Sequence, residues 1–139
     1  GCIYVNAKKP LKSVGKIITL PHPGFPTDAQ AIIMASLCKA NGISIFEETI
    51  FENRYRHVDS LVKMGADIKV IGKAAIITGV KKIYGAKVSA TDLRGGAAMA
   101  VAGLGAEGIT EITDVEHIDR GYENIEKVLT SMGGKITRA

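Results

Sequence analysis

The chain has no tryptophan, and aromatic residues make up only 5% of its 139 residues. Stacking surfaces for nucleic-acid bases are therefore scarce. The formal net charge of +4 mildly favours anionic ligands but is too small to predict a nucleic-acid partner. No apolar run reaches the roughly 18 residues that a membrane span needs. We therefore expect neither nucleic acid nor a membrane as a partner.

Several signatures of cofactor and metal sites are also missing. There is no GxxxxGKS/T phosphate loop, and the Gly95-Gly96 pair does not form a dinucleotide fingerprint. The three histidines and two cysteines lack metal-ligand spacing. No Ser/His/Asp or Cys/His order stands out. We expect no metal site and no cofactor.

The start of the chain shows no targeting segment, because lysines and a proline interrupt residues 8–12. Cys38 lies in an apolar helical pattern and is predicted to be a buried thiol, so nothing demands an oxidising compartment. The expected location is the cytoplasm. The first residue is Gly1 rather than Met, which leaves open that the chain is a fragment.

What is present is typical of a folded globular domain, with 46% hydrophobic and 23% charged residues. Periodicity and turn residues predict an α/β protein with helices packed on a mixed sheet. Helices are expected at 27–41, 57–64, 92–105 and 125–133, strands at 16–20, 43–48, 67–72, 74–80, 86–90, 108–115 and 135–139, and a loop at 116–123. Thr27, with Gln30 as its capping-box partner, and Thr91 are the predicted N-caps of two helices.

The two halves of the chain resemble each other. Thr27-Asp28 matches Thr91-Asp92, Arg54 matches Arg120 and Met64-Gly65 matches Met132-Gly133, at offsets of 64 to 68 residues. Such small drift predicts a duplicated supersecondary unit. We divide the chain into an N-terminal arm with a strand (1–26), a first unit (27–90) and a second unit (91–139).

The candidate functional residues lie at helix starts and turns. Asp28 and Asp92 open their helices, where a carboxylate is favourable by about 0.3–1 kcal/mol even without a functional role. The rigid stretch "PHPGFP" before Asp28 favours a role that needs a fixed carboxylate. Arg54, Arg94 and Arg120 are each consistent with solvated surface, but together they could converge on one carboxylate or phosphate.

Four stretches, "PHPGFPTDAQA", "IFENRYRHVDSLVKMGADI", "GVKKIYGAKVSATDLRGGAA" and "HIDRGYENIEKVLTSMGG", together resemble the C-terminal part of the UDP-N-acetylglucosamine 1-carboxyvinyltransferase family of enolpyruvyl transferases. The resemblance covers essentially the whole chain. It implies two lobes, each an inside-out α/β barrel of repeated βαβαββ units, with this chain in the C-terminal lobe. The missing N-terminal lobe of the same enzyme is then its partner.

The resemblance also implies a reaction and a set of site residues. The family transfers the enolpyruvyl group of phosphoenolpyruvate to the 3'-hydroxyl of UDP-N-acetylglucosamine, the first committed step of peptidoglycan synthesis, without a redox cofactor. By motif, Asp28 binds the sugar hydroxyl and is the proposed base, and Asp92 takes part in proton transfer. Ile50 contacts the nucleotide through its backbone. The phosphoenolpyruvate-binding arginines are Arg54, Arg94 and Arg120, of which Arg120 is also a catalytic candidate.

Two features qualify this picture. A carboxyl group, with an ordinary pKa of about 3.9, is a weak base for a sugar hydroxyl, so Asp28 is better suited to orient the hydroxyl and accept its proton late. The family's loop cysteine and N-terminal lysine belong to sequence that is absent here, and neither Cys2 nor Cys38 inherits the cysteine's role. We expect the isolated chain to be inactive.

Two other functions stay open at this point. One is an enolpyruvylshikimate phosphate synthase-like enzyme, whose substrate lacks a nucleotide. The other is a non-catalytic binding or assembly module, whose mark would be an exposed apolar face. The related RNA-cyclase fold keeps nucleic acid as a remote third option, which the low charge disfavours.

Overall fold

The computed structural model describes all residues except 5 and 7. Its larger sheet has the strand order β1-β2-β4-β3, in which β1 and β2 are parallel and the other pairs antiparallel. These strands are β1 (Gly15–Ile18), β2 (Ile43–Glu47), β3 (Asp67–Ile71) and β4 (Ala74–Thr78). A second, two-stranded sheet pairs β5 (Lys87–Ser89) with β6 (Glu111–Thr113) in parallel.

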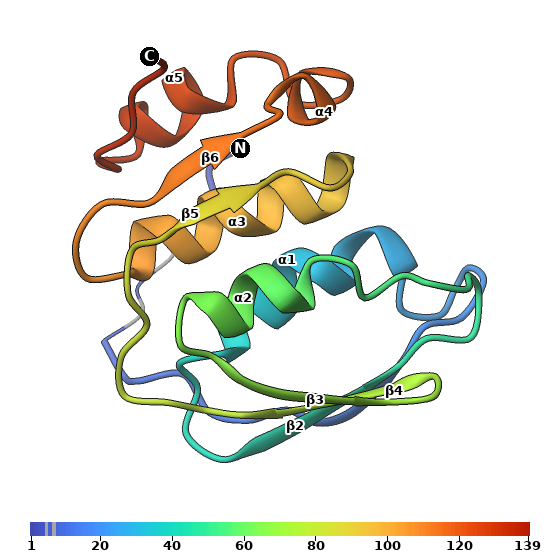
Figure 1. The fold of residues 1–139 in the computed structure, drawn as a ribbon. Coiled ribbons are helices and arrows are strands. Elements are labelled where there is room, and N and C mark those ends of the chain that lie inside the picture. Colours follow the sequence, from blue (N-terminus) through green and yellow to red (C-terminus); the bar gives the residue numbers. More distant parts are fainter. Residues whose placement is uncertain (5, 7) are drawn as a thin grey trace.

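Helices lie between the two sheets (Figure 1). The helices of the chain are α1 (Thr27–Leu37), α2 (Val58–Lys63), α3 (Leu93–Gly105), α4 (Glu116–Asp119) and α5 (Ile125–Ser131). The four-stranded sheet covers one side of α1 and α2, and β5, β6, α4 and α5 lie on the other side of α3 (Figure 1). Helices α1, α2 and α3 are therefore inside, between the two sheets.

Helices α1 and α3 form the most extensive contact between elements of different units. Small residues make this possible: α3 buries Ala97, Ala98 and Ala102, and α1 buries Ala31 and Ala35. Small side chains let two helix axes approach closely, so the starts of α1 and α3 come to lie near each other. Phe46 of β2 is fully buried under α1.

The chain order β1-α1-β2-α2-β3-β4 is one βαβαββ unit, as the fold class predicted. A second unit begins with β5-α3-β6, and its parallel pair β5–β6 corresponds to β1–β2. Each unit thus opens with the strand before its first helix, so β1 and β5 join the units that the sequence division began at residues 27 and 91. In the first unit β2 is paired on both edges, by β1 and β4. Among the described residues β6 is paired only with β5.

Several predicted boundaries were wrong. The first helix ends at Leu37 rather than near residue 41, and turns follow it. The predicted loop 116–123 contains the short helix α4, and the predicted strand at 135–139 is irregular. Gly65 and Gly133, which follow α2 and α5, have φ of 96° and 93°, a conformation that favours glycine after a helix.

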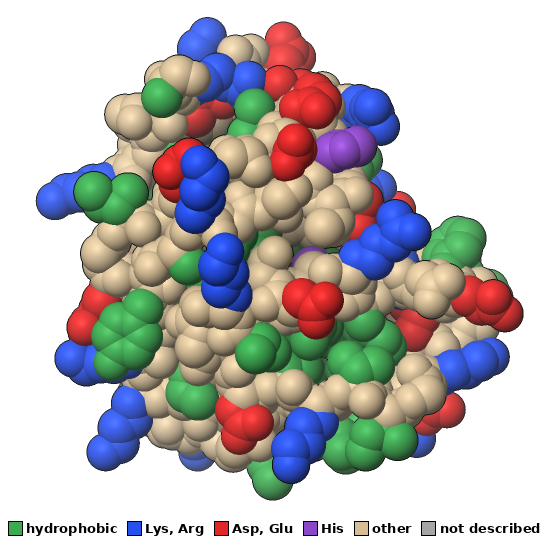
Figure 2. All heavy atoms as spheres, viewed as in Figure 1, with side chains coloured by type: hydrophobic (Ala, Val, Ile, Leu, Met, Phe, Trp, Pro, Cys, Tyr) green, Lys and Arg blue, Asp and Glu red, His purple; other side chains and the backbone are tan. Residues whose placement is uncertain are grey.

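The surface mixes charges of both signs. Figure 2 shows acidic and basic side chains interspersed with apolar ones over the face in view, rather than gathered by sign. No helix of the described residues is long and apolar enough to cross a membrane.

Candidate functional site

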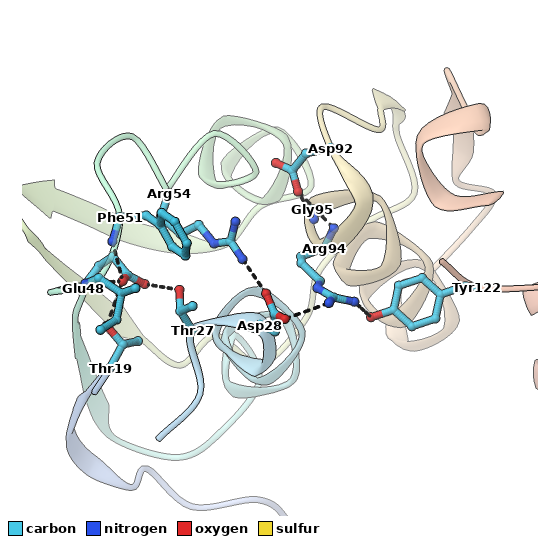
Figure 3. A network of polar contacts seen from close by, with 11 residues as sticks. Thr19, Thr27, Asp28, Glu48, Phe51, Arg54, Asp92, Arg94, Gly95 and Tyr122 are labelled. Carbon is cyan, nitrogen blue, oxygen red and sulfur yellow. Dashed lines mark hydrogen bonds and ion pairs between the residues drawn. The ribbon is translucent and has the colours of Figure 1, made fainter. Parts of the chain in front are cut away.

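Three of the predicted residues meet in one ion-pair cluster (Figure 3). Asp28, in the first turn of α1, accepts a hydrogen bond from Arg54 on one carboxylate oxygen and from Arg94 on the other, each at 2.8 Å. Arg54 precedes α2 and Arg94 is the second residue of α3. The cluster therefore joins the starts of α1 and α3 and the turn before α2, from both units of the chain.

An aromatic ring lies beside each guanidinium group. The Arg54 guanidinium lies 5.1 Å from the centre of the Phe51 ring. The Arg94 guanidinium lies 5.8 Å from the centre of the Tyr122 ring and donates a hydrogen bond of 3.2 Å to the Tyr122 hydroxyl. Cation–π contacts of this kind restrict a guanidinium without neutralising it. Both arginines are thus held in place beside the Asp28 carboxylate.

The arginines also set the ionisation of Asp28. The hydrogen bond from Arg94 is the largest influence on the Asp28 carboxyl and lowers its pKa. Burial opposes it, but the charges of Arg94 and Arg54 and the hydrogen bond from Arg54 lower the pKa further. The Asp28 side chain is 57% exposed, so solvent is close. Asp28 is consequently an ionised carboxylate and a weak base at neutral pH.

Asp92 is placed differently from Asp28, although the two match in the repeat. Asp92 is the N-cap of α3, and its Oδ1 accepts from the backbone N–H groups of Arg94 (2.9 Å) and Gly95 (2.8 Å). The prediction of Thr91 as the cap was therefore wrong by one residue. Asp92 lies beside the Asp28 cluster but does not hydrogen-bond to its carboxylate or guanidinium groups.

The predicted capping box at α1 was also wrong. The helix begins at Thr27 itself, after Pro26, and no side chain caps it. The Thr27 hydroxyl instead donates a 2.7 Å hydrogen bond to Glu48. Gln30 is fully buried, and neither polar atom of its side chain has a partner among the described residues. Proline before the helix and a competing carboxylate at Glu48 explain why the Thr-x-x-Gln pattern does not form a box.

The remaining two predicted residues lie nearby without joining the cluster. Arg120 is exposed at the end of α4, and no hydrogen bond links it to Asp28, Arg54 or Arg94. Its neighbour Gly121 packs against Leu93 at the start of α3, so the Arg120 backbone is held beside the cluster.

Ile50 is partly exposed, and its backbone N–H donates to Glu48 at 2.9 Å. The carbonyl oxygen is then the Ile50 backbone group left for a ligand.

The described residues offer no cluster of metal ligands. Among the residues that the structure describes, no group of three or more His, Cys, Asp or Glu side chains could hold a metal ion. The prediction for Cys38 is confirmed, since its thiol is buried and burial raises its pKa to about 12. Such a thiol is protonated and unreactive at neutral pH.

The sequence of this chain matches a known protein family. Residues 2–129 match the sequence model of the family described as EPSP synthase (3-phosphoshikimate 1-carboxyvinyltransferase). The chain belongs to the EPSP synthase family. Curated members of this kind include UDP-N-acetylglucosamine 1-carboxyvinyltransferase 2 of Caldanaerobacter subterraneus subsp. tengcongensis, 57% identical over 98% of this chain. UDP-N-acetylglucosamine 1-carboxyvinyltransferase 1 of Clostridium acetobutylicum is 53% identical over the same share.

The chain spans about a third of the length of these curated relatives, 33% and 32% respectively. Solved structures agree on the EPSP synthase family fold. The enolpyruvyl transferase NikO from Streptomyces tendae superposes on 96% of this chain with a TM-score of 0.84 at 24% identity, using 30% of its own length. An EPSP synthase from Acinetobacter baumannii covers 81% of this chain with a TM-score of 0.67 at 21% identity, using 27% of its own length. These likenesses confirm the predicted fold class.

Sequence reasoning missed two residues of the site in this EPSP synthase family chain, Tyr122 and Glu48. Tyr122 lies in the motif "HIDRGYE". The sequence alone could not show that the chain after α4 brings this tyrosine against Arg94. Glu48 did carry a signal. Side chains alternate along a strand, so Glu48 falls on the same face as the buried Ser44 and Phe46.

Proposed function

We propose that this chain forms part of the active site of a UDP-N-acetylglucosamine 1-carboxyvinyltransferase. The observation that carries the proposal is the identity of 52–57% to curated proteins of that name over nearly the whole chain. The enzyme joins the 3'-hydroxyl oxygen of the sugar nucleotide to the enolpyruvyl carbon of phosphoenolpyruvate, and inorganic phosphate leaves. In this proposal it acts in the cytoplasm, in peptidoglycan synthesis, and so serves cell-wall biogenesis, cell shape and cell division.

The Asp28 cluster gives each proposed role a physical basis. Arg54 and Arg94 present two fixed cations, which suit the carboxylate and phosphate of phosphoenolpyruvate. Arg120, whose backbone lies beside α3, would add a third when its side chain turns toward the ligand. Asp92 lies at the α3 start and is proposed to take part in proton transfer. Ile50 is proposed to contact the nucleotide substrate through its carbonyl oxygen.

Asp28 is proposed to orient the sugar hydroxyl and to accept its proton late in the reaction. Its lowered pKa supports this order, because an ionised carboxylate paired with two arginines has little tendency to take a proton from a neutral hydroxyl. The hydroxyl becomes acidic only as its oxygen bonds to an oxocarbenium-like carbon. The phosphoenolpyruvate anion that occupies the arginines would release Asp28 for this task.

The test uses the full-length protein that contains this chain. Phosphate release is measured with phosphoenolpyruvate and either UDP-N-acetylglucosamine or shikimate 3-phosphate as acceptor. The proposal expects turnover with the sugar nucleotide and at most a trace with shikimate phosphate. Turnover with shikimate phosphate alone would contradict it and would favour the second candidate, an EPSP synthase, which the description of the matching family supports.

The second unit has an exposed apolar surface. A cavity of about 790 Å³ lies between α3, β6, α5 and the C-terminal residues, with Leu104, Ile109 and Ile112 in its wall. Ile109 is 89% exposed. We propose that the rest of the longer protein, including its N-terminal lobe, packs against this apolar surface. The same surface is the feature that would suit a non-catalytic assembly module, and turnover by the full-length protein separates the two.

A further inference from the structure

A second carboxylate lies behind the ion-pair cluster. Glu48 follows directly after β2, and the residue is only 2% exposed. Its carboxylate has no lysine or arginine partner among the ion pairs of the described residues. A buried charge without a counter-ion is costly unless hydrogen-bond donors surround it. Hydrogen-bond donors must therefore compensate the charge of Glu48.

Four donors meet this one carboxylate (Figure 3). Oε1 accepts from the hydroxyl of Thr19 at 2.8 Å and from the backbone N–H groups of Ile50 at 2.9 Å and Phe51 at 3.2 Å. Oε2 accepts from the hydroxyl of Thr27 at 2.7 Å. Burial by itself raises the pKa of Glu48, but the four hydrogen bonds together outweigh it and hold the pKa below its usual value.

The donors belong to the segments that carry the candidate site. Thr27 is the residue before Asp28, in the first turn of α1. Ile50 and Phe51 open the turn that leads to Arg54, and the Phe51 ring lies against the Arg54 guanidinium. Glu48 thus binds the residue before Asp28 and the turn before Arg54. It makes no hydrogen bond with Asp28 or Arg54 themselves. With its N–H bound to Glu48, Ile50 has its carbonyl oxygen available to a ligand.

We propose that Glu48 is a positioning residue that fixes the start of α1 relative to the turn at residues 49–54, and so sets the binding of the sugar nucleotide. This inference rests on the proposed function for its kinetic consequences. It assigns Glu48 no contact with substrate: Glu48 acts through the Ile50 backbone on one side and through Thr27 and Asp28 on the other.

The test uses Glu48→Gln in the full-length enzyme, because an amide can accept on one side only and carries no charge. We expect the KM for UDP-N-acetylglucosamine to rise about tenfold, as loss of hydrogen bonds to a charged group predicts. Loss of folded protein alone would lower the apparent kcat and leave KM unchanged. The matched control is Glu47→Gln, which removes the neighbouring carboxylate, paired with Lys16 outside the site, and should keep the wild-type KM.

A second measurement does not depend on the reaction. Hydrogen exchange in the peptide covering residues 49–54 should be faster in Glu48→Gln than in the wild type, because the Ile50 and Phe51 N–H groups lose their acceptor. Unchanged exchange there, or an unchanged KM in an active variant, overturns the inference. A wild-type protein without turnover refutes the proposed function instead, and the exchange result then decides the role of Glu48.

Thr27→Val covers the case in which Glu48→Gln does not fold, since it removes only the hydroxyl on the α1 side. We expect the KM for UDP-N-acetylglucosamine to rise about threefold as the start of α1 loses its hydrogen bond to Glu48, and Thr27→Ser, which keeps the hydroxyl, to restore it. A wild-type KM in Thr27→Val overturns the inference.

Discussion

At the scale of single residues, the Asp28 carboxylate binds two guanidinium groups. Each oxygen of Asp28 is bound to a different arginine, Arg54 or Arg94. An anionic ligand that binds these arginines must compete with Asp28 for them. Once it has done so, the Asp28 carboxylate is free to accept a hydrogen bond from a hydroxyl group. Binding of the anion and readiness of Asp28 are thereby linked.

Asp28→Asn tests this link in the full-length enzyme. We expect kcat to fall about 100-fold, since the amide cannot accept the proton of the sugar hydroxyl. The KM for phosphoenolpyruvate should not rise, because the competing charge beside the arginines is gone. Steady-state kinetics with both substrates measure the two effects. Normal turnover by this variant would rule out the assigned role of Asp28.

His57 allows a prediction about pH. Its residue is 2% exposed between α2 and the start of α3, and burial lowers the pKa of its imidazole to about 4, against opposing attraction from Asp92. The unfolded chain binds a proton near pH 6.5 and the folded chain does not, so stability falls as pH drops from about 6.5 to about 4, by up to about 3 kcal/mol. Asp28 acts in a lower window, because its pairing is lost only as pH falls through its lowered pKa.

This loss of stability is measured as the fall in the thermal midpoint of the full-length protein between pH 7.5 and pH 4. His57→Gln should flatten the curve in that window, whereas His22→Gln, at an exposed position, should leave it unchanged. Equal slopes in the wild type and the His57 variant would contradict the assignment.

The sequence predicted the residues of the cluster better than their individual contacts. Repeat matching placed Asp28 and Asp92 at equivalent positions, and both do lie at helix starts. It could not show that α1 begins one residue before its aspartate and α3 one residue after. This single-residue difference turns Asp92 inward as a cap and leaves Asp28 free to face the arginines. Such a shift depends on Pro26 and on Glu48, which takes the Thr27 hydroxyl.

At the scale of elements, α3 depends on a glycine. A Cβ atom on Gly96 would lie 2.5 Å from Ile118 Cγ1 of α4 and 2.9 Å from the Cβ of Ala90. Contacts that short force neighbouring elements apart, so close packing of α4 on α3 requires glycine at this position. The same packing places Tyr122, four residues after Ile118, against Arg94.

Gly96→Ala should therefore destabilise the protein by about 1–3 kcal/mol, the usual cost of overpacking. Gly105→Ala is the matched control in the same helix, because its Cβ would meet only Lys39 Cδ at 3.9 Å. That change should be neutral or stabilising by up to about 1 kcal/mol, through better helix propensity. Thermal or urea unfolding of the two variants gives the comparison, and equal destabilisation would refute the packing argument.

Regular elements of the first unit were predicted well, because its strands and helices show clear periodicity and end at glycines. The second unit was predicted less well. Strand β6 covers only Glu111–Thr113 of the predicted 108–115, and residues 135–139 form no strand. A strand needs a partner to supply hydrogen bonds, and among the described residues none pairs with the outer edge of β6. Local sequence cannot report a missing neighbour.

At the scale of the whole molecule, the chain holds one complete βαβαββ unit and the beginning of another. The chain spans 33% of the length of one curated relative, and the resemblance implies that the family's loop cysteine and N-terminal lysine lie outside it. We expect the purified 139-residue chain to release no phosphate from phosphoenolpyruvate and UDP-N-acetylglucosamine, whereas the full-length protein does. Product formation by the chain alone, confirmed by mass spectrometry and abolished in Arg94→Ala, would refute this expectation.

The ion pair between Asp28 and Arg94 joins residues 66 positions apart, one from each unit. Duplication of a supersecondary unit can copy strands and helices, but it cannot copy a contact whose two halves have diverged into different partners. In the proposed function, each unit therefore supplies only part of the anion-binding site. Replacing either unit by a copy of the other would keep the fold but remove the ion pair between Asp28 and Arg94.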